Sequence, residues 1–172
     1  MKIRVDPASK QDRDVIWNLL QYYLHDFSEF DGTETDENGL YDYRYLDFYW
    51  HDPDRFPFLI RAEKSIAGFA LVRGENDPDT DTMVMEIAEF FVLRVFRQQG
   101  IGNKAAVQLW DMFPGEWRVR VLVENKPAYP FWQNAISDYT EGSFQVSQSA
   151  AVFGAHFTFS FNNSPKVASG NG

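Results

Sequence analysis

The residues whose types and spacing point most directly to chemistry lie between residues 90 and 104. An apolar run over residues 90–93 leads through a short loop into the sequence Arg97-Gln98-Gln99-Gly100-Ile101-Gly102-Asn103. Glycine lets a backbone approach a bulky anion closely, and the free N–H groups at a helix start carry partial positive charge. Arg94 and Lys104 add full positive charges beside this turn. The pattern predicts a pyrophosphate site, and a purely structural turn is the alternative.

A dinucleotide site of the nicotinamide or flavin type fits this turn less well. Its fingerprint places a third glycine three residues after the second, where this chain has Ala105. Alanine is tolerated there, but the fingerprint belongs near the start of its fold and is followed by an acidic ribose ligand. We therefore give preference to another phosphate-bearing ligand.

The elements that must position this turn follow from apolar periodicity and from glycine and proline. Helical spacing predicts a helix that is capped by Ser9 or Asp12 and carries the apolar residues from Val15 to Leu24. It also predicts helices over 43–50, 102–113 and 128–137. Alternation predicts strands over 2–5, 56–62, 66–73, 82–93, 117–123, 144–152 and 156–161. We expect an acidic loop over 26–42, a polar turn over 74–81 and a disordered tail over 162–172.

Composition limits the class of protein. With 172 residues, of which 44% are hydrophobic, residues 1–161 are expected to form one domain. The absence of cysteine excludes disulfides and thiolate nucleophiles, and His25, His51 and His156 are too dispersed for a metal site. No apolar run reaches the ~18 residues of a membrane span, and the N-terminus lacks a signal-peptide pattern. We expect a cytoplasmic protein that binds neither membrane nor metal.

The charge is unevenly distributed. The net charge of −9 argues against a nucleic-acid partner. Residues 1–93 carry nine basic and 20 acidic side chains, whereas residues 94–126 carry six basic and three acidic ones. One basic segment in an acidic protein indicates an anionic ligand at that segment, unless the clustering is chance.

The segment from Glu86 to Phe113 resembles the acetyl-coenzyme A motif of the GNAT N-acetyltransferase superfamily. In that motif an apolar strand ends in a loop, and Arg/Gln-x-x-Gly-x-Gly/Ala then opens a helix. Arg97, Gly100 and Gly102 match it, and Val92 lies eight residues before Gly100, as in the family. Downstream, the sequence Asn125-x-x-Ala128-x-x-Phe131-Trp132 is similar to a second motif of the family, Asn-x-x-Ala-x-x-Phe-Tyr.

The resemblance implies a fold and a cofactor. The fold would be α/β (α+β), with a mixed, mostly antiparallel sheet of six or seven strands, flanked by about four helices and split between the fourth and fifth strands. Acetyl-coenzyme A would be the co-substrate. The backbone of Phe90 and Val92, with Phe91 between them, would pair with its pantetheine amides. The amides of residues 98–103 would hold its pyrophosphate, and Asn125 would touch the pantetheine or the leaving sulfur.

The activity implied is direct attack of an amine on the thioester, for which a carboxylate must accept a proton, directly or through water. Glu86 and Glu89 lie in the strand that leads to Val92. In an unbroken strand they point to opposite faces, so only one would reach the cleft unless a bulge intervenes. Both positions correspond to bases used in the family, and Glu86 is the preferred candidate. The alternative is a surface carboxylate or a core ion pair with Arg61 or Arg73.

One position departs from the family pattern. Where a tyrosine usually protonates the departing thiolate, this chain has Trp132, whose indole cannot act as a general acid. Tyr129, about one helical turn earlier, is a candidate replacement. A thiolate with a pKa of about 8.5 would also leave with help from water or Asn125.

The acceptor is predicted only by class. The seven carboxylates of the acidic loop, together with its aromatic residues, would suit a primary amine that is cationic, either a small molecule or lysine-like. A solvated loop is the alternative meaning of the same run. Strands over 144–161 would allow a homodimer, as in many relatives. A second function is a non-catalytic acyl-coenzyme A sensor or assembly domain.

Overall fold

The computed structural model describes residues 1–151 and 154–165. In that part of the chain, seven strands form one sheet in the order β1-β2-β3-β4-β5-β7-β6. The strands are β1 (Ile3–Pro7), β2 (Arg55–Ala62), β3 (Ser65–Asp77), β4 (Thr82–Val92), β5 (Glu116–Leu122), β6 (Gln145–Ala151) and β7 (Gly154–Asn162). Every neighbouring pair is antiparallel except β4 and β5, which are parallel and are joined through a helix. The expected mixed, mostly antiparallel sheet is confirmed.

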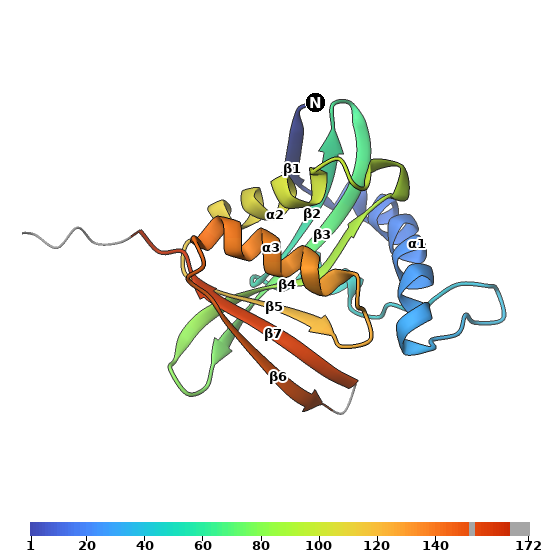
Figure 1. Cartoon of the computed structure of the whole chain (residues 1–172). Coiled ribbons are helices and arrows are strands. Elements are labelled where there is room, and N and C mark those ends of the chain that lie inside the picture. Colours follow the sequence, from blue (N-terminus) through green and yellow to red (C-terminus); the bar gives the residue numbers. More distant parts are fainter. Residues whose placement is uncertain (152–153, 166–172) are drawn as a thin grey trace, which may run out of the picture.

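Helices cover both faces of the sheet (Figure 1). The α-helices of the described residues are α1 (Arg13–Asp31), α2 (Ile101–Met112) and α3 (Ala128–Thr140). Short 3-10 helices are η1 (Lys10–Asp12), η2 (Leu46–Trp50) and η3 (Arg94–Phe96). Strand neighbours such as Leu71 and Val72 alternate between two hydrophobic clusters, because successive side chains point to opposite faces. One cluster contains α2 and α3, and the other contains α1 and η2.

The sheet divides between β4 and β5. These strands pair only from Val84 to Ile87 on β4, although β4 continues to Val92 and β5 to Leu122. On the other side of β4, the register shifts by one residue, so that Leu71 pairs with Glu89 and Val72 with Ile87. Ala88 is therefore the extra residue of a β-bulge, located where the pairing with β5 ends.

Two expected loops are partly regular structure. Residues 26–31, predicted as loop because of their acidic side chains, form the last turns of α1, which ends at Gly32 with φ of 70°. Residues 74–77, predicted as turn, extend β3 because they pair with residues 82–85 of β4. Cross-strand pairing outweighs the turn character of Gly74 and Asn76 at these positions.

Two other expectations were wrong in part. The helix predicted over 43–50 is only the 3-10 helix η2, which leaves three α-helices in the described residues where about four helices were expected. The predicted tail begins inside β7, at Asn162, and the side-chain amide of Asn163 donates to the Trp110 carbonyl at 2.7 Å. The prediction for residues 166–172 lies outside the described residues. No helix in the described part is long and apolar enough to cross a membrane.

Candidate functional site

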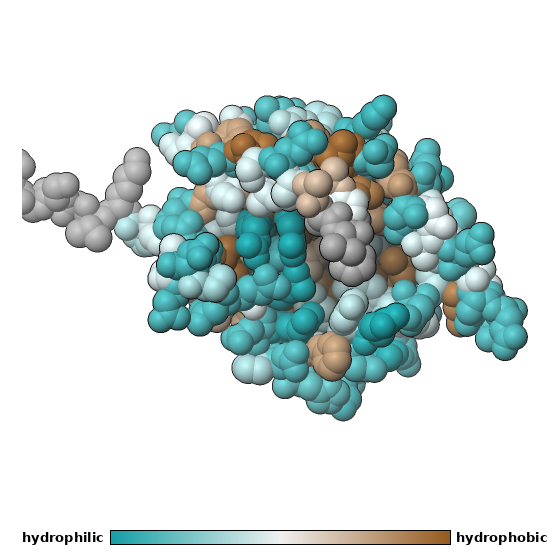
Figure 2. All heavy atoms as spheres, turned by 90° about the horizontal axis from the view of Figure 1, so that it is seen from below, coloured by the Kyte–Doolittle hydropathy of each residue, from teal (hydrophilic) through white to brown (hydrophobic). Residues whose placement is uncertain are grey.

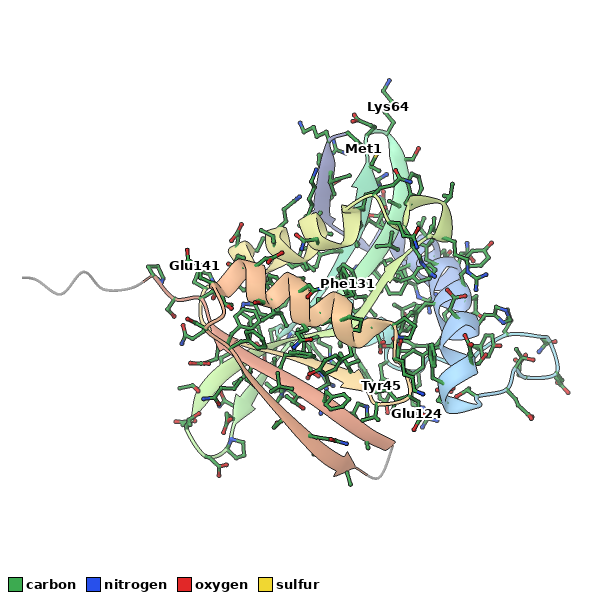
Figure 3. The ribbon with its side chains drawn as sticks, viewed as in Figure 1. Met1, Tyr45, Lys64, Glu124, Phe131 and Glu141 are labelled. Atoms are coloured by element: carbon green, nitrogen blue, oxygen red, sulfur yellow. The ribbon has the colours of Figure 1, made fainter. Side chains whose placement is uncertain are left out.

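A cleft of about 570 Å³ lies where four elements meet. They are the second half of α1, the end of β4 with the loop that follows it, the start of α2, and the start of α3 with the loop before it. The residues that line it are Tyr23, Asp26, Phe27, Glu29, Phe30, Phe90, Phe91, Val92, Arg94, Arg97, Gln98, Gly102, Asn125, Pro127, Ala128 and Phe131. Figure 3 shows Phe131 on α3, near the segment after β5 that carries Glu124. The cleft thus brings both sequence motifs together.

The glycine turn presents backbone amides at one side of this cleft. Gln98 and Gly100 have positive φ values of 59° and 73°, and α2 begins at Ile101 with Gly100 as its N-cap. Helical bonding starts with the amide of Lys104, which donates to the Gly100 carbonyl at 3.1 Å, so the amides of residues 101–103 precede it. A left-handed residue followed by a helix start gives a concave set of N–H groups that suits an anion.

Apolar packing and one side-chain hydrogen bond fix the start of α2 and the loop before it. Ile101 is buried in the cluster beneath α2, which anchors the turn. A Cβ on Gly102 would lie 3.1 Å from two ring carbons of Phe131, so glycine allows α2 and α3 to approach closely. Gln99 donates to the Val95 carbonyl at 2.8 Å, which holds the preceding loop. Asn103 lies in the first turn of α2.

The basic residues beside the turn are paired with an acid from α1. Asp26 accepts from Arg97 Nη2 at 2.7 Å and also from Arg94. Burial acts against ionisation of Asp26, but these hydrogen bonds outweigh it, so the pKa of Asp26 is lowered. Arg97 Nε also donates to the Val92 carbonyl at 2.8 Å. The arginines are therefore held at the mouth of the cleft by a carboxylate that an anionic ligand would displace.

The end of β4 offers backbone to the cleft. Phe90 and Val92 face α2 and α3, and Phe90 packs against Trp132 and Phe131 at centroid distances of 5.1 and 6.1 Å. Phe91 lies in the opposite cluster, with the Arg97 guanidinium 5.4 Å from its ring centroid. Among the described residues, β4 has no β5 partner beyond Ile87, so this edge is available to pair with a ligand.

The second motif positions a polar group and two aromatic ones. Asn125 lines the cleft, and its Oδ1 accepts from the Ala128 amide at 3.3 Å, which satisfies the first free N–H group of α3. Trp132 is buried between Phe90 and Trp110. Tyr129, the candidate acid, packs against Phe157 and Phe159 at 4.7 and 5.3 Å. The contacts of Trp132 and Tyr129 are those of packed aromatic residues.

Glu86 lies at the centre of an arginine cluster. It is 2% exposed, and Arg120 binds both of its carboxylate oxygens, at 2.6 and 2.9 Å. Arg73 Nη2 donates to the same carboxylate at 3.0 Å, and Arg118 lies 3.7 Å away. Of the two alternatives from the sequence, this geometry matches the core ion pair with Arg73, extended by two arginines of β5. Arg61 pairs with Asp6 instead.

Glu89 has a different environment. Its Oε2 accepts from the Tyr23 hydroxyl at 2.6 Å, and its Oε1 accepts from the Tyr43 hydroxyl at 3.0 Å. Burial raises the pKa of Glu89, and the two hydrogen bonds offset only part of that effect. Because of the bulge at Ala88, Glu89 lies on the same face as Glu86, which an unbroken pleat would not allow.

Sequence reasoning missed Tyr23, Tyr43 and Asp26. The tyrosines lie 66 and 46 residues from Glu89, and no local pattern links them to it. Tyr23 is four residues after the buried Leu19, so helical spacing alone would have turned it toward the sheet. Burial and the bond to Glu89 also raise the pKa of Tyr23, which keeps its hydroxyl a donor.

Comparisons with known proteins agree with this geometry. A similar structure is an acetyltransferase from Thermus thermophilus, with a TM-score of 0.67 and 14% identity over 94% of this chain and 97% of that one. An aminoglycoside acetyltransferase in complex with coenzyme A gives 0.63 and 14%, over 94% and 95%. A spermidine N-acetyltransferase from Vibrio cholerae gives 0.60 and 13%, over 94% and 94%.

These structures share the fold at low identity, and no curated protein matches the sequence. A family model described as "Acetyltransferase (GNAT) family" matches residues 16–135, which is more than half of the chain. The resemblance stated from the two motifs is therefore confirmed: the chain belongs to the GNAT acetyltransferase family.

Proposed function

We propose that this protein transfers an acetyl group from acetyl-coenzyme A to the primary amine of a small molecule. The observation that carries the proposal is that one cleft joins the unpaired edge of β4 to the amide-rich turn at the start of α2. One structural neighbour is an aminoglycoside acetyltransferase bound to coenzyme A, and another is a spermidine N-acetyltransferase. Both of those proteins act on small amines.

The donor would occupy the length of the cleft. Its pyrophosphate would accept hydrogen bonds from the amides of residues 98–103 and would form an ion pair with Arg97. Its pantetheine arm would pair with the backbone of Phe90 and Val92 and pass Asn125. For the Val92 carbonyl to take part, Arg97 Nε must turn away from it, which the arrival of a phosphate would favour because Arg97 then gains a stronger partner.

Glu89 is the base in this proposal. The amine nitrogen attacks the acetyl carbon, the C–N bond forms, and the C–S bond breaks. The proton lost by the nitrogen passes to Glu89, either directly, through water, or through Tyr23, which lines the cleft and donates to Glu89. Glu86 is less suited because Arg120 and Arg73 already bind its oxygens.

The same proton can complete the reaction. A protonated Glu89 returns it to the coenzyme A thiolate, which has a pKa of about 8.5 and near neutral pH can also take its proton from water. Tyr129 receives no role as acid here, because its ring packs against Phe157 and Phe159.

The test is release of free thiol from acetyl-coenzyme A in the presence of a panel of primary amines. We expect turnover with at least one amine and thermal stabilisation by acetyl-coenzyme A alone. Stabilisation without turnover on any amine would favour the sensor or assembly function. No stabilisation at millimolar acetyl-coenzyme A would contradict donor binding itself.

Replacing Asp26 by asparagine is expected to tighten coenzyme A binding about fivefold. The substitution removes a negative charge that competes with the phosphates for Arg94 and Arg97, and an ion pair with exposed arginines is worth up to about 1 kcal/mol. Titration calorimetry at low salt would measure the change. Asp42→Asn, an exposed acid outside the cleft lining, is the control. Weaker binding by Asp26→Asn would show instead that Asp26 positions the arginines for the ligand.

The pH profile should report Glu89. Because burial raises the pKa of this carboxyl above 4.5, kcat/KM should fall with decreasing pH at a higher pH than an ordinary glutamate would give. Tyr43→Phe removes a hydrogen bond that lowers the pKa of Glu89, so the acidic limb should move further up in pH. Tyr45→Phe, outside this contact, is the control. An acidic limb that does not move in Tyr43→Phe would argue against Glu89 as the base.

A further inference from the structure

Among the residues that the structure describes, the apolar cluster on the α1 side covers only one half of that face of the sheet. The apolar cluster on this face draws its strand residues from β2, β3 and β4 only. On β5, Trp117, Val119 and Val121 belong to the opposite cluster, so Arg118 and Arg120 point to the α1 side. Their direct partners on β7 are Ser160 and Thr158, which in turn pair with Gln145 and Ser147 of β6.

The positive and negative charges of this open half-face balance, whereas the protein as a whole is acidic. The charged residues around Arg118 and Arg120 on this half-face are Arg73, Glu75, Glu86 and Glu116, so three positive charges face three negative ones in a chain of net charge −9. The neighbouring positions on β6 and β7 are neutral hydrogen-bonding side chains. Figure 2, seen from below, on the side of β6 and β7, shows hydrophilic residues over most of the surface.

The arginines retain binding capacity. Arg120 uses Nε and Nη2 on Glu86, yet its side chain is still 41% exposed. Arg118 donates from Nη2 to Glu75 at 2.8 Å, and its side chain is still 26% exposed. A guanidinium has five N–H donors in a fork that matches a carboxylate or phosphate. Both side chains therefore have donors left for a ligand.

The open half-face adjoins the proposed base. Glu86 and Glu89 are separated by the bulge and lie on one face, roughly 7 Å apart along the strand, as for residues i and i+2. The Arg73 guanidinium lowers the pKa of Glu89 by its charge, which agrees with this closeness. A molecule whose amine faces Glu89 would thus extend over the arginines.

Of the seven carboxylates expected to bind a cationic acceptor, only Asp26 and Glu29 line the cleft. Asp26 binds Arg94 and Arg97, and Asp31 accepts from the Thr33 amide. Asp36 accepts from the amides of Asn38 and Leu40 and so closes its own turn. Figure 1 shows the loop after α1 projecting away from the sheet. The carboxylates of the acidic loop therefore do not gather in one pocket that would bind a cation.

We propose that the acceptor is an amine that also carries an anionic group, a carboxylate or a phosphate, and that Arg118 and Arg120 bind this group on the open half-face while the amine faces Glu89. This inference rests on the proposed function and specifies its substrate class. The spacing from Glu89 to the arginines requires several bonds between the amine and the anion.

The experiment compares matched pairs of amines at equal acetyl-coenzyme A. δ-Aminovalerate is compared with its amide, aminopropyl phosphate with aminopropanol, and cadaverine serves as the cationic amine. We expect kcat/KM to be about tenfold or more higher for at least one anionic member than for its neutral partner, because hydrogen bonds to charged groups are stronger than those to neutral groups. The two pairs distinguish a carboxylate from a phosphate.

Variants assign the effect to the arginines. In Arg118→Gln the ratio of kcat/KM for the anionic amine to that for its neutral partner should fall about tenfold, whereas Arg118→Lys should retain part of it. Lys64→Gln removes the same charge at the β2–β3 turn, far from Glu124 and α3 in Figure 3, and should leave the ratio as in the wild type. The ratio corrects for any general loss of folded protein.

The outcomes separate the two proposals. If no amine is acetylated, the proposed function fails. If cadaverine or the neutral amines are acetylated as fast as the anionic ones, the function stands and the inference about the acceptor is overturned. A wild-type preference that survives in Arg118→Gln and in Arg120→Gln would place the anion elsewhere and overturn the inference equally.

Discussion

Glu89→Gln is expected to lower kcat by about 10²- to 10⁴-fold, the range that a general base contributes. Glutamine keeps the size of the side chain: its oxygen can still accept from one of the two tyrosine hydroxyls, and its NH2 group can donate to the other hydroxyl oxygen, so both contacts, at 2.6 and 3.0 Å, can persist with one of them reversed. Only the capacity to take a proton disappears. Steady-state kinetics at saturating acetyl-coenzyme A would measure the effect, with KM for the donor unchanged.

The control is a thermal unfolding curve with and without acetyl-coenzyme A. The variant should unfold near the wild-type temperature and should still be stabilised by the donor. Turnover within threefold of the wild type would remove Glu89 from the mechanism. If Glu86→Gln then lost activity without losing stability, Glu86 would take its place.

Glu86→Ala is expected to reduce the free energy of unfolding by about 3–5 kcal/mol. The change leaves three arginines facing one another without their shared carboxylate, and breaking a buried pair by removing one partner has this order of cost. The arginines are 25–41% exposed and can partly turn to solvent, which favours the lower end of the range. Urea unfolding monitored by tryptophan fluorescence would give the value.

Glu75→Ala provides the matched control. Glu75 pairs with Arg73 and Arg118, but its side chain is 42% exposed, so removing it should cost less than about 1 kcal/mol. Equal losses in the two variants would mean that burial of the Glu86 carboxylate adds nothing to the strength of the cluster.

The sequence predicted the turn that we propose to hold the phosphates, because the residues of this turn lie close together in the chain. Gly100, Gly102 and Arg97 lie within one turn of chain, and their spacing from Val92 is fixed by covalent structure. Most helices and strands were predicted for the same reason, since periodicity is read within one element. The extension of β3 to Asp77 was missed because only pairing with β4 determines it.

The proposed catalytic part of the site could not be predicted from local sequence patterns. Whether Glu86 and Glu89 share a face depends on the bulge at Ala88, and no residue type in that strand predicts a bulge. The two environments are then assembled by distant segments. Arginines of β3 and β5 surround one glutamate, and tyrosines of α1 and the following loop bind the other. Such contacts arise only once the sheet has formed.

The short pairing between β4 and β5 has a mechanical consequence. The pairing of the two strands ends at Ile87 and Val119, and beyond these residues the strands diverge. Strands that diverge in this way can separate further by losing one backbone pair at a time. The Glu86 carboxylate lies just inside the paired segment, and Arg120, beyond the last pair, reaches back to it. The charge cluster therefore links β4 and β5 at the point where their pairing ends, and it limits how far the two strands separate. Weakening the charge cluster would therefore change how a ligand fits between β4 and β5, even if the ligand does not contact the cluster.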